Sequence, residues 1–155
     1  MTNGVISADS PLAPDVRELL NRHLAFTTAT SPPEHMHAMN ANALLDPAIS
    51  FFSYRRDGVL LGVGALKRLD DAHAEVKSMH TAQAARGTGI GRAMLEHLLA
   101  VARQHGFRRV SLETGTMAEF APARALYASA GFAPCEPFAG YRPSPDNTFM
   151  TLAIA

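Results

Sequence analysis

A glycine-rich turn that opens directly into a helix is the feature that most constrains this chain. Gly87, Gly89 and Gly91 stand on alternate positions, where glycine reaches backbone conformations closed to other residues and lets a ligand approach the main chain. From Ile90 the apolar residues recur every three or four positions, which predicts an amphipathic helix that ends at Gly106. The first N–H groups of such a helix lack intrahelical partners and lie at the positive end of its dipole. The segment therefore predicts an anion site, most often one for phosphate.

Two common phosphate-binding patterns do not fit these glycines. Gly-x-Gly-x-x-Gly fails because its third glycine falls on Arg92 or Met94, and the Walker pattern fails because arginine rather than lysine follows Gly91. What remains is Arg86-x-x-Gly89-x-Gly91, with Arg86 and Arg92 on either side of the turn. Two guanidiniums beside a helix N-terminus suit a pyrophosphate, to which they can donate paired hydrogen bonds. The alternative is that the glycines only form a tight strand-to-helix turn.

Composition narrows the class of protein and its partners. The 155 residues, 47% of them hydrophobic, predict one globular domain over 1–155. Lys plus Arg equal Asp plus Glu, 14 against 14, without a long block of either sign, so nucleic acid and anionic membranes are poor partners. No apolar run approaches the ~20 residues that cross a bilayer, and the first residues do not resemble a signal peptide. We therefore expect a cytoplasmic protein, and the single Cys135 agrees with a reducing compartment.

Periodicity and turn signals predict the other elements. Asp57-Gly58 between two apolar runs predicts a β-hairpin, and Ser31-Pro-Pro-Glu34 predicts a capped helix start. Gly131 predicts the end of a late helix. The expected order is a strand at 3–7, a helix from about 15, a second helix with its apolar stripe over 36–44, antiparallel strands at 49–54, 59–66 and 73–81, the helix from 90, a strand at 109–114, a helix at 122–130 and a closing strand at 149–154.

The histidines and the cysteine do not predict a metal site or a nucleophile. His35 and His37 are two positions apart, so on a helix they point in different directions. His23 on the first helix is expected to be a core residue. Cys135 stands among prolines without an acidic or histidine partner nearby. We expect no metal.

With these motifs in this order, the chain resembles the GNAT superfamily of acyl-CoA-dependent N-acetyltransferases, most strongly from Glu75 to Phe132. Arg86-Gly-Thr-Gly-Ile-Gly91 matches the family's Gln/Arg-x-x-Gly-x-Gly/Ala loop, which in relatives holds the coenzyme A pyrophosphate on backbone N–H groups. Glu75-Val-Lys-Ser-Met-His80 is similar to the strand before that loop, and Ala123-x-x-Leu126-Tyr127-x-x-x-Gly131-Phe132 to the late helix motif. One position differs from the family pattern: many relatives carry an asparagine seven residues before the tyrosine, and this chain has Phe120 there.

This resemblance implies an α/β fold of the α+β type, in which a central mixed, mostly antiparallel twisted sheet of six to seven strands is flanked by about four helices. It implies acetyl-CoA as the co-substrate and a small-molecule or peptide amine as the acceptor, with direct attack in a ternary complex. The residues it nominates for the cofactor are Met79, His80, Thr81, Arg86, Gly87, Thr88, Gly89, Ile90, Gly91 and Arg92.

Aminolysis of a thioester requires a base, because free lysine-like amines have a pKa of about 10 and are protonated at neutral pH. Glu75 lies eleven residues before Arg86, the spacing at which many relatives place a base glutamate that acts directly or through water. The alternative is a strand carboxylate that is solvated or paired with Lys77. Glu113 is the second candidate for the base, or a substrate contact, and Tyr141 is expected near the acceptor.

The later steps need a donor to the oxyanion and a proton for the leaving thiolate. A strand amide near Met79 is the expected oxyanion donor. The resemblance nominates Tyr127 as the general acid. Its position on an apolar helix stripe leaves a purely structural role open.

Two other functions are compatible with the same residues. A non-catalytic acyl-CoA-binding protein would share the pocket, and a dinucleotide- or S-adenosylmethionine-binding enzyme would share a glycine turn followed by a helix, a strand and Glu113. Only 155 − 113 = 42 residues follow Glu113, too few for the further units of that fold. A homodimer is possible, and the sequence does not identify the acceptor. A cationic amine would be bound by Glu75 and Glu113, whereas an acceptor that bears a carboxylate would be bound by Arg142 or Arg55.

Overall fold

One mixed sheet of seven strands runs through the described chain, which comprises residues 4–30 and 41–154 of the computed structural model, with the backbone alone for 23–30. The strands are β1 (Val5–Ala8), β2 (Ile49–Arg56), β3 (Val59–Arg68), β4 (His73–Thr81), β5 (Arg109–Gly115), β6 (Ala133–Cys135) and β7 (Asn147–Ala153). Their order across the sheet is β1-β2-β3-β4-β5-β7-β6, and all neighbours are antiparallel except β4 and β5. The expected strand number and the mostly antiparallel pairing are confirmed.

Three α-helices occur in the described part of the chain, fewer than the four expected. They are α1 (Pro14–Thr30), α2 (Ile90–Gln104) and α3 (Ala121–Ser129), with short 3-10 turns η2 (Ala43–Leu45), η3 (Gln83–Ala85) and η4 (Ala118–Phe120). The predicted second helix from 31, with His35 and His37, falls outside the described residues. Its expected last part is a 3-10 turn, because Pro47 holds Asp46 extended (φ −55°, ψ 134°) and no helix can run through that position.

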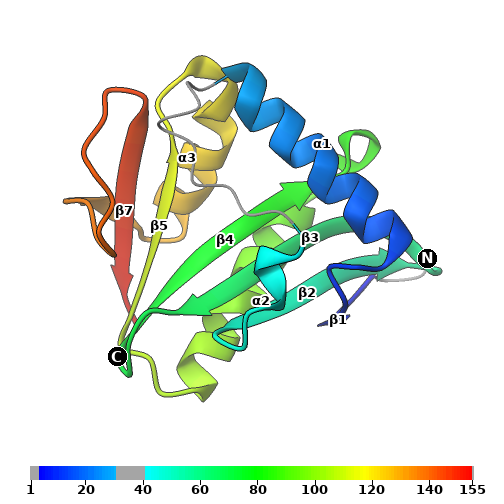
Figure 1. Cartoon of the computed structure of the whole chain (residues 1–155), viewed down its shortest axis with the longest axis horizontal. Coiled ribbons are helices and arrows are strands. Elements are labelled where there is room, and N and C mark those ends of the chain that lie inside the picture. Colours follow the sequence, from blue (N-terminus) through cyan, green and yellow to red (C-terminus); the bar gives the residue numbers. More distant parts are fainter. Residues whose placement is uncertain (1–3, 31–40, 155) are drawn as a thin grey trace.

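The helices cover both faces of the sheet. In Figure 1, α1 crosses in front of the strands and α2 lies behind them. On the α1 face, Val16 and Leu20 pack against Val63 and other residues of β2 and β3. On the α2 face, one larger core joins α2, α3 and the central strands; its fully buried members include Met94, Leu95, Leu98, Val110 and Leu112.

Two glycines on β3 set the position of α2. A Cβ atom at Gly64 would lie 2.7 Å from Cγ of Met94, and one at Gly62 would lie 3.0 Å from Cγ2 of Ile90. Real Cβ atoms do not approach as closely as 2.7 Å and seldom come as close as 3.0 Å, so a larger residue at Gly64 would push α2 away from the sheet and one at Gly62 would crowd its first turn. The start of α2, where the glycine turn ends, is thereby held against the end of β4.

The parallel pair β4–β5 stays together over only three residues. His73, Ala74 and Glu75 pair with Arg109, Val110 and Ser111, and no ladder pair joins the two strands beyond Glu75. Figure 1 shows β4 and β5 diverging from this point. The residues that follow Glu75 therefore border a separation in the middle of the sheet.

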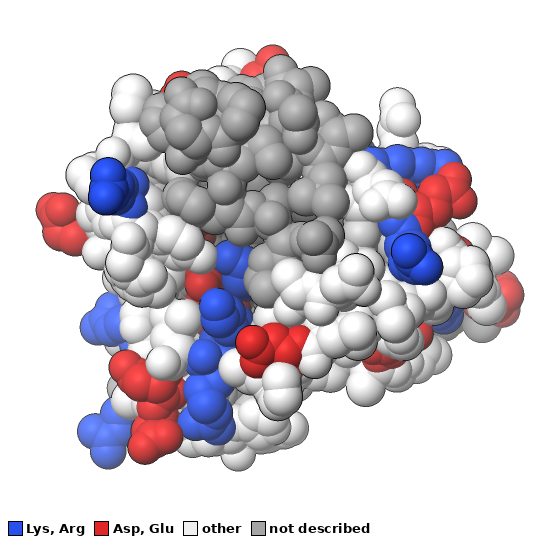
Figure 2. All heavy atoms as spheres, viewed as in Figure 1, with Lys and Arg blue, Asp and Glu red and all other residues white. Residues whose placement is uncertain are grey.

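The surface carries charges of both signs. Figure 2 shows basic and acidic side chains beside one another over the visible face, in keeping with the equal numbers of 14 and 14. Within residues 4–30 and 41–154, no helix has both the length and the apolarity that crossing a membrane requires.

His97 is a half-buried titratable group in α2. Its ring packs edge-on against Phe52, with centroids 4.6 Å apart, and its Nε2 is buried with no hydrogen-bond partner among the described residues. Burial lowers the pKa of His97 from its ordinary value of 6.5.

We expect the unfolding temperature to fall as the pH is lowered from 7 to 5. Because the pKa of His97 is lower in the folded state than in the unfolded chain, the stability present above pH 6.5 is lost as the unfolded state binds a proton. Burial lowers the pKa of His73 as well, which acts in the same direction. His97→Leu should flatten this part of the curve, whereas His105→Leu, at an exposed ring, should keep it. An unchanged acid loss in His97→Leu would contradict the assignment. Thermal melts across this pH range provide the measurement.

Candidate active site

The glycine turn has the geometry of an anion site. Gly87 (φ 77°) and Gly89 (φ 86°) are both left-handed, and Gly89 is the N-cap of α2. The first intrahelical bond runs from the Ala93 N–H to the Gly89 carbonyl over 3.0 Å, so the N–H groups of the three intervening residues have no intrahelical partner. The Thr88 hydroxyl donates to the Ala85 carbonyl and closes the turn. Residues 86–89 are exposed, which leaves these amides accessible to a ligand.

The two arginines beside the turn behave differently. Arg86 is exposed next to the glycines. The Arg92 guanidinium instead donates to Oγ of Ser129 over 2.9 Å and so joins α2 to α3. A cavity of about 280 Å³ opens between these helices and includes Arg92 and Arg103 in its lining. The sequence did not predict this cavity, because no motif signals where two helices meet.

A β-bulge interrupts β4 near the end of the strand that leads to the glycine turn. Val63 pairs with His80 and Ala65 with Lys77, so Gly64 alone opposes Ser78 and Met79. Ser78 has φ 53°, a conformation that residues with a side chain rarely adopt, and its buried Oγ has no partner among the described residues. The bulge releases the backbone here from regular pairing with β3, at a position where strain of this kind often marks a functional site.

The bulge also changes which face each side chain takes. Before it, Lys77 lies on the α1 face with its pair Ala65, which packs in the α1 core. After it, Met79 packs against the core beneath α2, and Thr81 turns its hydroxyl towards Gly91 at the start of α2. Of the residues nominated for the cofactor, Met79 and Thr81 therefore lie on the α2 face, whereas His80 pairs with Val63 and faces the α1 side.

Glu75 is the centre of a buried polar cluster at the point where β4 and β5 separate. Its side chain is only 2% exposed, and Nζ of Lys77, itself 8% exposed, lies 3.2 Å from Oε2. The Tyr141 hydroxyl donates to the same carboxylate, 2.9 Å from Oε2 and 3.2 Å from Oε1. Lys77 also donates to the Tyr141 oxygen over 2.8 Å. The pairing with Lys77 was the alternative considered for Glu75, and here it coexists with a contact to Tyr141, 66 residues away in the chain.

Aromatic rings support the Tyr141 phenol. Its ring is stacked on Phe149 at an interplanar angle of 27° and meets Phe138 edge-on, with centroids 6.0 and 5.5 Å away. Burial raises the pKa of Tyr141 well above its ordinary value, and the carboxylates Glu75 and Glu113 raise it further. The phenol is therefore neutral and able to donate a hydrogen bond.

Glu113 lies on the same face as this cluster. It pairs with Phe149 on β7 and accepts a hydrogen bond from Nδ2 of Asn147 over 2.8 Å. Its charge acts on the pKa of Tyr141, so the structure brings together Glu75, Glu113 and Tyr141, the three residues predicted on the amine side. Lys77 and Phe138 join them, and neither residue carries a sequence signal of a functional role.

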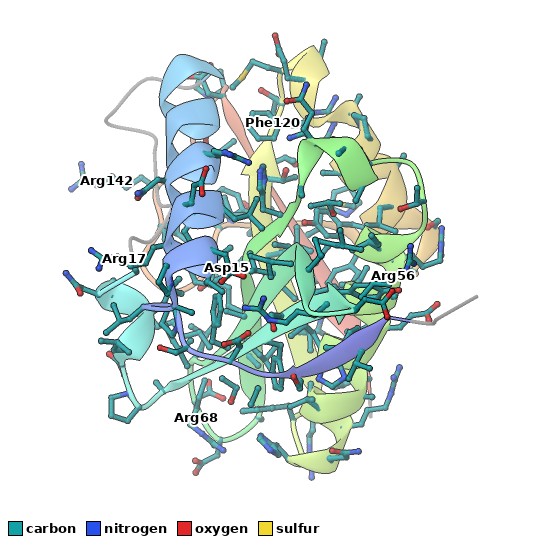
Figure 3. All side chains as sticks on the ribbon, turned by 90° about the vertical axis from the view of Figure 1, so that its right-hand side faces the viewer. Asp15, Arg17, Arg56, Arg68, Phe120 and Arg142 are labelled. Carbon is teal, nitrogen blue, oxygen red and sulfur yellow. The ribbon has the colours of Figure 1, made fainter. Side chains whose placement is uncertain are left out.

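Tyr127 lies on the opposite face, among the α2 and α3 core residues. It is buried, its ring meets Phe132 edge-on at 6.0 Å, and burial raises its pKa to about 12. Phe120, which replaces the asparagine of many GNAT relatives, lies over the end of β5, where a Cβ on Gly115 would be 2.3 Å from its ring. Phe120 is labelled in Figure 3.

The arginines considered for a carboxylate-bearing acceptor lie elsewhere. Arg55 forms ion pairs with Asp15 (2.6 Å) and Asp9 (3.1 Å), which tie β2 to the chain around α1. Arg142 is exposed and lies at the outer margin of the molecule in Figure 3. In the described residues, no three His, Cys, Asp or Glu side chains gather as a metal site would require.

Known proteins share both this sequence pattern and this fold. Residues 15–132 match the acetyltransferase (GNAT) family. YsnE of Bacillus subtilis (strain 168), an uncharacterized N-acetyltransferase, is 44% identical over 149 residues, which are 96% of this chain and 99% of that protein. The IAA acetyltransferase of Azospirillum brasilense is 36% identical over 151 residues, 97% of each chain.

Solved structures agree with the sequence comparison. A GNAT family acetyltransferase from Elizabethkingia anophelis, with acetyl-CoA bound, shares the fold at a TM-score of 0.72 and 16% identity, over 98% of this chain and 99% of that one. A dinucleotide or S-adenosylmethionine fold does not fit, because only one strand pair of the sheet is parallel. The family match spans the glycine turn, the separating strands and α3, and the chain therefore belongs to the GNAT family of N-acetyltransferases.

Proposed function

We propose that this acyltransferase moves an acetyl group from acetyl-CoA to a primary amine by direct attack in a ternary complex. The observation that carries the proposal is the separation of β4 from β5 after Glu75, with the glycine turn at the far end of β4. The bound acetyl-CoA in a structural neighbour supports the choice of carrier. The amine-side residues and Tyr127 lie on opposite faces of the sheet, so one substrate can approach the separation from each face.

The carrier side uses the main chain. The N–H groups of Ile90, Gly91 and Arg92 bind the pyrophosphate, assisted by the helix dipole and by Arg86. The α2–α3 cavity takes the nucleotide end of the carrier, with Arg92 and Arg103 available for its phosphate. The backbone released by the bulge at Ser78 and Met79 supplies a donor for the thioester oxyanion.

On the amine side, the acceptor nitrogen attacks the thioester carbon once it has lost a proton. Glu75 is the final acceptor of that proton, and Glu113 attracts a cationic amine to the separation between the strands. The new C–N bond forms first and leaves the negative charge on the thioester oxygen. The C–S bond then breaks, coenzyme A leaves as a thiolate, and the nitrogen releases its second proton to water. Holding the two substrates together contributes much of the rate.

Tyr127 assists the departure of the thiolate as a hydrogen-bond donor. Its pKa of about 12 exceeds that of a cysteine-like thiol, about 8.5. At this pKa the phenol is neutral at pH 7 and can donate a hydrogen bond to the sulfur. The phenol stabilises the charge that develops on sulfur, and the thiolate takes its final proton from water.

Tyr127→Phe should lower kcat about 10- to 30-fold and change the KM for acetyl-CoA less than about threefold. The ring keeps its packing against Phe132, so the loss isolates the hydroxyl. Steady-state kinetics with thiol detection measure both constants, and Tyr54→Phe on β2 is the matched control. Equal changes in kcat and KM would show that the Tyr127 hydroxyl takes no part in the chemical step.

The function itself is tested by thiol release from acetyl-CoA over an array of primary amines, including small diamines, amino acids and peptides, with IAA tested alongside as a compound outside that class. IAA is included because one relative carries its name. Amine-dependent release with a matching acetylated product supports the transferase. Tight acetyl-CoA binding in calorimetry without release for any amine would instead favour an acyl-CoA-binding protein.

A further inference from the structure

The sealed position of Glu75 poses a problem for its role as the base. Its side chain is 2% exposed, and both carboxylate oxygens lie within hydrogen-bond distance of the Tyr141 hydroxyl. The other contact of the Glu75 carboxylate is the Lys77 ammonium, which is 8% exposed and already forms an ion pair with Oε2. An acceptor amine cannot reach such a carboxylate directly, so its proton must pass through a neighbouring group.

Tyr141 has the chemistry and the position for this transfer. A hydroxyl can accept one proton while it gives up another, whereas an ammonium can only donate. Tyr141 is partly exposed, while Glu75 and Lys77 are buried. Its ring is clamped by Phe138 and Phe149, which fixes the oxygen against the carboxylate.

We propose that Tyr141 relays the proton of the acceptor amine to Glu75, with Lys77 holding phenol and carboxylate in register. This inference rests on the proposed acetyl transfer. The N–H bond of the ammonium breaks as a new O–H bond forms on the Tyr141 oxygen. The original O–H bond of Tyr141 breaks as an O–H bond forms on Glu75. The amine is left neutral with its lone pair, Tyr141 is again a phenol, and Glu75 returns the proton to water after turnover.

The charges around the Tyr141 phenol favour a relay in which no phenolate intermediate forms. Glu75 and Lys77 face it from β4 and Glu113 faces it from β5, while β7 contributes no ionisable side chain. Burial and the two carboxylates raise the pKa of Tyr141, so the resting group is the neutral phenol. The two proton movements are therefore coupled, and Lys77 balances part of the negative charge nearby.

The relay is tested with Tyr141→Phe, which keeps the ring stacking and removes only the hydroxyl. With the best alkylamine of the array, kcat/KM at pH 7 should fall about 100-fold, at the lower end of the range of general-base effects. The variant should then gain about tenfold per pH unit up to pH 9, because only amine that is already neutral in solution can react. The analogue with fluorine atoms beside the amine is unprotonated at pH 7, and its acetylation should change less than about threefold. Tyr54→Phe should match the wild type with both amines.

The possible outcomes distinguish a failure of the proton relay from a failure of the proposed acetyl transfer. Equal losses with the alkylamine and its fluorinated analogue would show that Tyr141 only supports the structure, and no loss with either would also overturn the relay. The double variant Glu75→Gln/Tyr141→Phe should be no slower than the worse single variant, since both groups lie on one proton path; additive losses would contradict this. A wild-type protein that releases no thiol with any amine would overturn the acetyl transfer and the relay with it.

Discussion

Gly89→Val should weaken acetyl-CoA binding by about three orders of magnitude. Gly89 is left-handed at φ 86°, a conformation that costs a residue with a side chain about 1–2 kcal/mol and a β-branched residue more. Valine would therefore pull the N-cap of α2 out of its present conformation and turn the following N–H groups away from a common point. Loss of two charge-assisted hydrogen bonds at about 2 kcal/mol each corresponds to about 1000-fold in Kd. Calorimetry with acetyl-CoA measures this loss.

Gly106→Val is the matched control, at the other end of the same helix. Gly106 has φ 80°, and neither position has a heavy atom within 4 Å of an added Cβ, so steric clash does not distinguish the two variants. Both variants should lose similar thermal stability, and only Gly89→Val should lose its affinity for acetyl-CoA. Retained binding in Gly89→Val would show that the glycine turn does not hold the pyrophosphate.

The sequence predicted the sheet well because local signals mark its strands. The hairpin at Asp57-Gly58 formed with both residues left-handed, at φ 52° and 79°, as this dipeptide favours. Gly131 follows the end of α3, as its position after the apolar stripe predicts. The order of β7 between β5 and β6 could not be read in the same way, because pairing between distant strands leaves no local pattern.

The candidate site was predicted only in part, for the same physical reason. The glycine turn is one contiguous segment, so its residues and their role follow from the sequence. Tyr141 lies 64 positions from Lys77 and 66 from Glu75 in the chain, and only the folded sheet brings it within hydrogen-bond distance of them. The bulge at Ser78 was equally hidden, because serine there breaks no visible pattern and its φ of 53° is imposed by the strands.

The buried ion pair predicts a second large effect, on stability. Glu75→Gln leaves the Lys77 ammonium, 8% exposed, without its counter-charge, and Lys77→Met leaves the Glu75 carboxylate, 2% exposed, without its own. Breaking a buried pair from one side costs about 3–5 kcal/mol. At about 2–4 °C per kcal/mol for a domain of this size, each single variant should melt about 10 °C lower. Thermal melts measure this, and Glu18→Gln at the exposed Glu18–Arg22 pair should shift the melting temperature by less than about 3 °C.

The double variant Glu75→Gln/Lys77→Met separates the stability of the pair from its function. Neither buried charge remains, glutamine can still accept the hydrogen bond from Tyr141, and methionine fills most of the lysine volume. Its melting temperature should therefore return to within about 3 °C of the wild type, well above either single variant. Turnover should stay low, because no carboxylate remains at the end of the proton path. A double variant as unstable as the sum of the singles would mean that the two charges contribute independently, whereas recovered turnover would show that Glu75 takes no proton from the amine.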